Sequence, residues 1–140
     1  MSDSASASTT GSVTWTNVAT GRCLSYDNLV SGPDSSVYTT DCLPRGGQFS
    51  VSWKDAQASD GSWTQKTMDN RCLTSFGNSV YLENCAGNAD DTNWYERWYE
   101  LSTTTGWKLK NRMTGMILDS NAAGDVYAIS SNGTNYQRWK

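Results

Sequence analysis

The chemistry open to this 140-residue chain is limited first by the complete absence of histidine. Histidine is the commonest general base and metal ligand, and the usual partner of a nucleophilic serine or cysteine. Acid–base catalysis would therefore depend on carboxylates alone, and glycoside hydrolysis needs two of them roughly 5 to 9.5 Å apart across a cleft. The available pairs, Asp90 with Asp91 and Glu96 with Glu100, lie in or beside one loop insertion. We therefore expect no enzymatic activity and no cofactor.

The four cysteines, at positions 23, 42, 72 and 85, are the other residues with distinctive chemistry. None of them forms a Cys-x-x-Cys motif, and no histidine is present to complete a tetrahedral zinc site. The spacing therefore predicts no metal site and leaves two disulfides as the expected state.

The composition indicates short strands joined by many turns. Hydrophobic residues make up 36% of the chain and charged residues 18%, and the net charge is −3. No stretch gathers several Lys or Arg, which argues against nucleic acid as a partner, and no apolar run approaches the ~20 residues of a membrane span. Residues 1–10 form a Ser/Ala/Thr tract expected to be a disordered tail or linker stub, and no signal peptide is recognisable in this chain.

A threefold internal repeat organises the remaining residues, 11–140. The segments GRCLSYD, NRCLTSF and GMILDSN align at 21–27, 70–76 and 115–121, and a Val-Tyr pair follows each of them at 37, 80 and 126. The period is about 45 to 49 residues, and each unit reads as four short strands separated by turns. Three such units predict an all-β fold, a twelve-stranded β-trefoil with pseudo-threefold symmetry and repeats at about 11–58, 59–103 and 104–140.

A third anchor closes each repeat. It reads Gln48-Phe49-Ser50, Glu96-Arg97-Trp98 and Gln137-Arg138-Trp139, so that this alignment puts Ser50 where the other two repeats have tryptophan. The repeated Cys, Leu, Val and Trp positions are expected to form the shared core.

The repeat also pairs the cysteines. Cys23 with Cys42 and Cys72 with Cys85 occupy equivalent positions, and the third repeat replaces both partners together, by Ile117 and Ser131. We therefore predict the disulfides Cys23–Cys42 and Cys72–Cys85. They imply an oxidising compartment, and hence secretion.

The Gln-x-Trp motif of the third repeat, the Cys-Leu pairs at 23 and 72 and the threefold period together resemble ricin-type β-trefoil lectin domains. Within that family, residues 118–139 are most similar to the repeats of actinohivin-type mannose-binding lectins. The resemblance implies non-catalytic binding of mannose- or galactose-type glycans, by a free lectin or by the binding module of a secreted enzyme, which would then be a tethered partner domain.

In that family a repeat can carry a shallow sugar pocket, and the resemblance assigns its residues by position. Asp119 is the bidentate hydrogen-bond acceptor, Tyr127 and Tyr136 are the aromatic walls, Asn132 is the amide, and Gln137 supports Asp119. Asp119 is expected to be exposed, so that its replacement by alanine would leave stability nearly intact.

The first two repeats depart from this pattern. Thr74 and Ala86 stand at the Asp and Asn positions of repeat two, and Ser25 and Leu43 stand there in repeat one. The sequence therefore predicts one intact pocket, in the third repeat.

Plainer interpretations remain open beside the sugar site. Asp119-Ser120-Asn121 and Asn132-Gly133 are also ordinary turn sequences. The alternative function is a β-trefoil protease inhibitor or protein–protein interaction module that presents an exposed loop, with residues 43–47 and 86–95 as the candidate loops.

Overall fold

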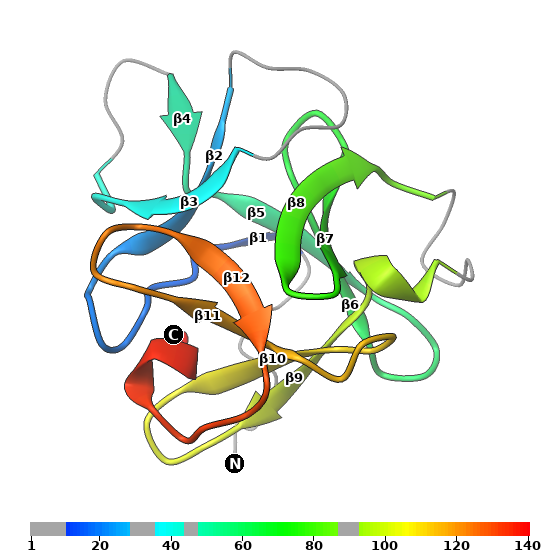
Figure 1. Ribbon diagram of the computed structural model, residues 1–140. Helices are drawn as coiled ribbons and strands as arrows, with labels where there is room; N and C mark the ends of the chain where they lie inside the picture. The colour runs from blue at the N-terminus through cyan, green and yellow to red at the C-terminus, as the bar shows by residue number, and fades with distance from the viewer. Residues whose placement is uncertain (1–10, 29–35, 44–47, 87–92) are drawn as a thin grey trace.

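The computed structural model describes residues 11–28, 36–43, 48–86 and 93–140. These residues form twelve short strands and two 3-10 turns, whose order in space is shown in Figure 1. The strands are β1 (Gly11–Val13), β2 (Cys23–Asp27), β3 (Val37–Thr40), β4 (Phe49–Ser50), β5 (Trp53–Gln57), β6 (Trp63–Lys66), β7 (Arg71–Phe76), β8 (Ser79–Asn84), β9 (Trp98–Ser102), β10 (Trp107–Asn111), β11 (Ile117–Ser120) and β12 (Val126–Ile129). The 3-10 turns are η1 (Trp94–Glu96) and η2 (Asn135–Gln137).

A ring of antiparallel pairings forms the barrel. The strands β1, β5, β6, β9 and β10 pair in that order. Backbone bridges from Trp139 to Trp107 and to Asn17 then connect the two ends of this series. These bridges close the ring within the part of the chain that the structure describes.

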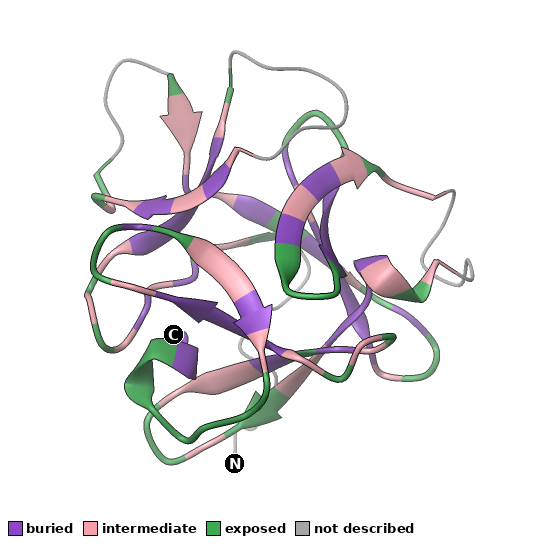
Figure 2. Ribbon diagram, in the orientation of Figure 1, coloured by how far each residue is buried: buried purple, intermediate pink, exposed green. Residues whose placement is uncertain are grey.

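Three hairpins, β2–β3, β7–β8 and β11–β12, pack over the barrel, one from each repeat. The first strand of each hairpin is the more buried, as Figure 2 shows. Together the barrel and the three hairpins are the all-β trefoil that the sequence predicts.

The centre of the molecule repeats one tryptophan–leucine contact three times. The indole N–H of Trp98 donates to the carbonyl oxygen of Leu73 at 2.9 Å, and that of Trp139 donates to the carbonyl oxygen of Leu118 at 3.1 Å. In repeat one the same bond is made by Trp53, to Leu24, at 2.9 Å. All six side chains are fully buried.

This contact corrects the sequence alignment of repeat one. Ser50 is not the counterpart of Trp98 and Trp139; Trp53 is, three positions further along the chain. The sequence Val51-Ser52-Trp53 therefore replaces Gln-x-Trp. The alignment failed because the distance from the Val-Tyr pair to the core tryptophan differs between repeats: it is 16 residues in repeat one, 18 in repeat two and 13 in repeat three.

Both predicted disulfides are present, Cys23–Cys42 and Cys72–Cys85, and no free cysteine remains. Each closes a short loop, of 19 and 13 residues in sequence separation. Such loops typically stabilise a fold by roughly 2–4 kcal/mol by restricting the unfolded chain. The third repeat has Ile117, fully buried, in the corresponding core position.

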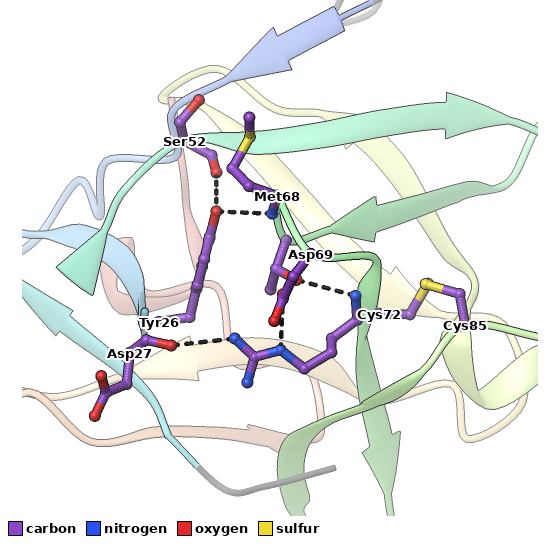
Figure 3. A network of polar contacts seen from close by, with 9 residues as sticks. Tyr26, Asp27, Ser52, Met68, Asp69, Cys72 and Cys85 are labelled. Carbon is purple, nitrogen blue, oxygen red and sulfur yellow. Dashed lines mark hydrogen bonds and ion pairs between the residues drawn. A yellow bond between two sulfur atoms is a disulfide. The ribbon is translucent and has the colours of Figure 1, made fainter. Parts of the chain in front are cut away.

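A buried arginine, Arg71, links repeats one and two; Figure 3 labels its partners Asp27 and Asp69. Arg71 is 1% exposed; its guanidinium donates to the carbonyl oxygen of Asp27 at 3.1 Å and to the carboxylate of Asp69 at 2.9 Å. Beside it, the hydroxyl of Tyr26 donates to the carbonyl oxygen of Ser52 at 2.8 Å and accepts the amide of Met68 at 3.1 Å. These polar groups join two repeats at the edge of the hydrophobic core, to which Tyr26 itself belongs.

Among the residues that the structure describes, no helix is long and apolar enough to span a membrane, and no three His, Cys, Asp or Glu side chains cluster as metal ligands would. The predicted tail at 1–10 lies outside the described residues.

Candidate functional site

A pocket of about 210 Å³ opens on the surface of the third repeat. It brings together side chains from β11, β12 and the segment that leads into η2. Its lining is Asp119, Ser120, Asn121, Tyr127, Ile129, Asn132, Thr134 and Tyr136. Four of the five residues that the sequence singled out therefore line one cavity, and the fifth, Gln137, lies directly behind it.

Asp119 forms the base of this pocket. It faces Tyr127 across the β11–β12 pair, and one carboxylate oxygen accepts the backbone amide of Ser120 at 2.7 Å. Only 2% of Asp119 is exposed, so the expectation of an exposed acceptor is wrong. The strand turns the carboxylate inward, where hydrogen bonds from the protein hold it. Replacement of Asp119 by alanine will therefore lower the stability of the fold as well as sugar binding.

Gln137 holds Asp119 in place. Its side-chain amide donates to the second carboxylate oxygen of Asp119 at 3.0 Å and to the carbonyl oxygen of Ser130 at 2.9 Å. Its side-chain oxygen accepts the backbone amide of Asn132 at 2.9 Å. Gln137 is fully buried and thus fixes both the acceptor and the loop on the far side of the pocket.

Two tyrosines form the walls. Tyr127 is half-buried and donates its hydroxyl to the carbonyl oxygen of Ser120 at 3.3 Å. Burial, followed by the nearby charge of Asp119, raises the pKa of Tyr127, so this hydroxyl stays protonated at neutral pH. Tyr136 is 41% exposed, and its backbone carbonyl is fixed by the side-chain amide of Asn17 at 2.9 Å.

Asn132 lies on the exposed rim. Its side-chain oxygen accepts the amide and the hydroxyl of Thr134, at 3.0 and 2.8 Å, which orients the side-chain NH₂ group as the donor available to a ligand. The turn interpretation and the site interpretation of this residue are therefore compatible.

The pocket offers a fixed charged acceptor, an amide and two aromatic faces. Each carboxylate oxygen retains a further lone pair beyond the protein hydrogen bond it accepts, so adjacent hydroxyl groups of a ligand can donate to Asp119 while an apolar face packs against a tyrosine. The sequence did not single out the lining residues Asn121, Ile129 and Thr134, because nothing in their spacing distinguishes them from turn and strand residues.

The corresponding positions of the other repeats lack the carboxylate. Ser25 and Thr74 are fully buried and donate to carbonyl oxygens of their own strands, Cys23 at 2.8 Å and Cys72 at 2.9 Å. In repeat one, the corrected alignment places Ser50 and Val51 at the positions of Tyr136 and Gln137. Repeat one therefore has no aromatic ring at the first of these positions and no side-chain amide at the second.

In repeat two, Glu96 occupies the position of Gln137. Its carboxyl group accepts the backbone amide of Ala86 at 3.0 Å, as Gln137 does from Asn132. The side-chain amide of Asn93 donates to Glu96 at 3.1 Å and to Glu83 at 3.0 Å, so the two carboxyl groups meet there. Burial, with a smaller contribution from Glu83, raises the pKa of Glu96 from 4.5 to about 7.

The raised pKa of Glu96 predicts that the protein loses stability as the pH rises from about 5 to about 8. In this window the folded state holds a proton that the unfolded chain releases, so the free energy of unfolding falls as that proton is lost. Thermal unfolding at several pH values measures the effect, and Glu96→Gln should flatten the profile. An increase in stability over this range, or an unchanged slope in Glu96→Gln, would contradict the assignment.

The two loops proposed for a protease-inhibitor function fall mainly outside the described residues, which omit 44–47 and 87–92. The same holds for Asp90 and Asp91. Of the other carboxylate pair, Glu100 accepts the side-chain amide of Gln65 at 3.1 Å, whereas Glu96 contacts Ala86 and Asn93. The two glutamates thus have separate partners.

Comparison with known proteins identifies the family and the fold. A family model described as the ricin-type beta-trefoil lectin domain matches residues 11–139. Among solved structures, the designed threefold-symmetric protein ThreeFoil is 19% identical, with a TM-score of 0.76 over 93% of this chain and 96% of ThreeFoil.

Two further structures show the fold in sugar-related proteins. SeviL, solved bound to an asialo-GM1 saccharide, is 17% identical with a TM-score of 0.72, over 94% of this chain and 95% of SeviL. A GlcNAcα1-4Gal-releasing endo-β-galactosidase from Clostridium perfringens is 15% identical with a TM-score of 0.74, over 93% of this chain but 31% of the enzyme. At these identities the likeness establishes the fold alone.

Proposed function

The chain belongs to the family of ricin-type β-trefoil lectin domains, and from that premise we propose that it binds glycans through the third-repeat pocket. Carbohydrate binding is what membership of this family implies. The proposal assigns that binding to Asp119, Tyr127, Asn132 and Tyr136, with Gln137 as the residue that positions Asp119.

The observation that carries the assignment is the fixed carboxylate at the base of the pocket. Asp119 is oriented by Ser120 and Gln137 and lies between two tyrosine walls. A pyranose has the complementary surface, because adjacent hydroxyls can donate to one carboxylate while the C–H face of the ring lies on an aromatic side chain. In the described residues, repeat three is the place where all of these groups converge.

Mannose-type glycans are the first ligands to test, because the third repeat resembles actinohivin-type mannose-binding lectins. Galactose-type glycans are the second class. SeviL, which shares the fold, was solved with an asialo-GM1 saccharide, so both classes belong in the same experiment.

The disulfides favour a secreted protein, because disulfides persist in oxidising compartments. Either a free lectin or the binding module of a larger enzyme fits the chain. The Clostridium perfringens enzyme is an example of a longer chain that contains a domain of this fold. In both cases we propose that this domain itself is non-catalytic.

A glycan array followed by titration calorimetry tests the proposal. We expect array binding, with monosaccharide dissociation constants near millimolar, since a shallow pocket that orders one ring leaves about −4 to −5 kcal/mol of binding free energy. Tyr136→Ala should weaken binding at least about tenfold, which corresponds to about 1.4 kcal/mol. Leu43→Ala, a change at the exposed residue that repeat one has at the Asn132 position, serves as the matched control and should leave binding unchanged.

An empty array together with stoichiometric inhibition of a protease would contradict the proposal. That result would favour the protease-inhibitor alternative, in which an exposed loop is the binding element.

A further inference from the structure

Repeat two presents exposed aromatic side chains at the place that corresponds to the third-repeat pocket. Phe76, the last residue of β7, is 61% exposed, and its ring centroid lies 5.4 Å from that of Tyr95 on η1. Trp94, the preceding residue of η1, is 41% exposed. Apolar rings gathered on the surface of a small soluble domain commonly mark a binding site.

The backbone that holds the third-repeat pocket is reproduced here. The pair Thr74–Tyr81 occupies the register of Asp119–Tyr127, and η1 contacts β7 as η2 contacts β11. The carbonyl oxygen of Tyr95 accepts the side-chain amide of Asn111 at 2.9 Å, the same bond that Asn17 makes to Tyr136. Repeat two therefore has the frame of the pocket, with different side chains in it.

In repeat two a carboxyl group stands on the second strand of the hairpin, whereas in repeat three Asp119 stands on the first. Glu83 on β8 pairs with Cys72, whereas in repeat three Ile129 pairs with Ile117 and lines the pocket. Glu83 thus stands at a lining position, two residues from Tyr81 and on the same face of its strand. Thr74, which stands at the position of Asp119, has no carboxyl group, whereas Glu83 on the neighbouring strand has one.

Neighbouring polar groups orient Glu83. Asn93 donates to it at 3.0 Å and to the buried Glu96 at 3.1 Å, so Glu96 and Asn93 together support Glu83 as Gln137 supports Asp119. Glu83 is half-buried, and its carboxyl group also hydrogen-bonds the side chains of Tyr81 and Glu96, which places it beside the ring of Tyr81. An oriented acceptor beside exposed rings is the combination that a saccharide requires.

We propose that repeat two carries a second saccharide site of a different construction, in which a neutral pyranose stacks on Phe76 and Tyr95 and donates hydroxyl hydrogen bonds to Glu83. The carboxylate of Glu83 selects against sialic or uronic acids, because the carboxylate of such a sugar would be repelled. The site extends the proposed function to a repeat that lacks the family's aspartate, and it can exist whether or not the third-repeat pocket binds.

Two-dimensional amide NMR on the ¹⁵N-labelled protein separates the two sites. The backbone amides of Ala86 and Asn132, which donate to Glu96 and Gln137, lie beside repeat two and repeat three respectively. Lactose and mannobiose, titrated separately to about 10 mM to match millimolar affinity, are the probes. We expect at least one of them to shift the Ala86 amide in a saturable manner.

Single substitutions assign those shifts. Phe76→Ala and Glu83→Ala should each weaken the response at Ala86 at least about tenfold and leave the response at Asn132 in place. Asp119→Asn should do the reverse. Phe76 is exposed, so its loss should not prevent folding, which the dispersion of the same spectra verifies.

The outcomes distinguish the two proposals. Shifts at Asn132 with none at Ala86, or shifts at Ala86 that survive both repeat-two variants, overturn the second site and leave the proposed function standing. Shifts at Ala86 alone support the second site and overturn the third-repeat assignment. Absence of shifts at both amides with both sugars overturns both.

Discussion

Replacing Asp119 by asparagine is expected to weaken sugar binding at the third-repeat pocket by about 100-fold, because a hydrogen bond to a charged acceptor contributes about 1.5–3 kcal/mol. The carboxylate is fixed by the amide of Ser120 at 2.7 Å and by Gln137 at 3.0 Å. Asparagine keeps the size of the side chain but removes the charge and half of the acceptor capacity. Titration calorimetry with the best glycan from the array measures the change.

The matched control is Ser25→Ala, at the Asp119 position of repeat one. Ser25 is buried, bonded to its own strand, and has no ligand role in either proposal, so its replacement should leave binding unchanged. Thermal unfolding of the Asp119 variant checks that the pocket still folds. If Asp119→Asn is fully folded and binds as tightly as the unmodified protein, the carboxylate is not the recognition group.

Replacing Arg71 by methionine is expected to destabilise the protein by about 2 kcal/mol, because it removes the hydrogen bond from a buried guanidinium to a main-chain carbonyl, and a hydrogen bond from a charged group contributes about 1.5–3 kcal/mol. The change removes the hydrogen bond to the carbonyl oxygen of Asp27 and the cation that lies 6.0 Å from the ring of Tyr26. Methionine is the residue that repeat three carries at this position, Met116, so its size suits the fold. Urea unfolding gives the difference in free energy.

Arg22→Met is the matched control, at the same position of repeat one. Arg22 is only partly buried and bonds Thr39 within its own repeat, so we expect a loss below about 1 kcal/mol, as for other partly exposed polar contacts. Equal losses in the two variants would show that Arg71 does not act as a link between repeats.

Local motifs were sufficient to predict the fold and both disulfides, because each repeat carries a Cys-Leu or Ile-Leu pair and a Val-Tyr pair whose valine stands five residues before the second cysteine position. The alignment failed at Ser50 for a physical reason. The core requires an indole that reaches the carbonyl oxygen of Leu24, and Trp53, three positions after Ser50, meets that requirement. A fixed count of residues does not reveal which tryptophan points inward.

The sequence predicted four residues that line the pocket, but it did not predict how deeply Asp119 is buried. The resemblance to ricin-type lectin domains assigned Asp119, Tyr127, Asn132 and Tyr136 to one pocket, with Gln137 as the support of Asp119. Spacing did not reveal that Asp119 is buried, because burial depends on how η2 folds back over β11. The contact between Glu83 and Glu96 was missed for the same reason, since it requires the hairpin and the 3-10 turn to be positioned together.

The bridges made by Trp139 have a consequence for the order in which the molecule folds. The side-chain contact beside them joins Asn17 to Tyr136 over 119 residues of chain, whereas the disulfide loops span 19 and 13. Closing a long loop costs more entropy than closing a short one, and folds rich in such distant pairings reach the native state slowly. The three hairpins are local, so we expect them to form before the ring closes. Because Asn17 holds the backbone of Tyr136, the third-repeat pocket is among the last features of the protein to take shape.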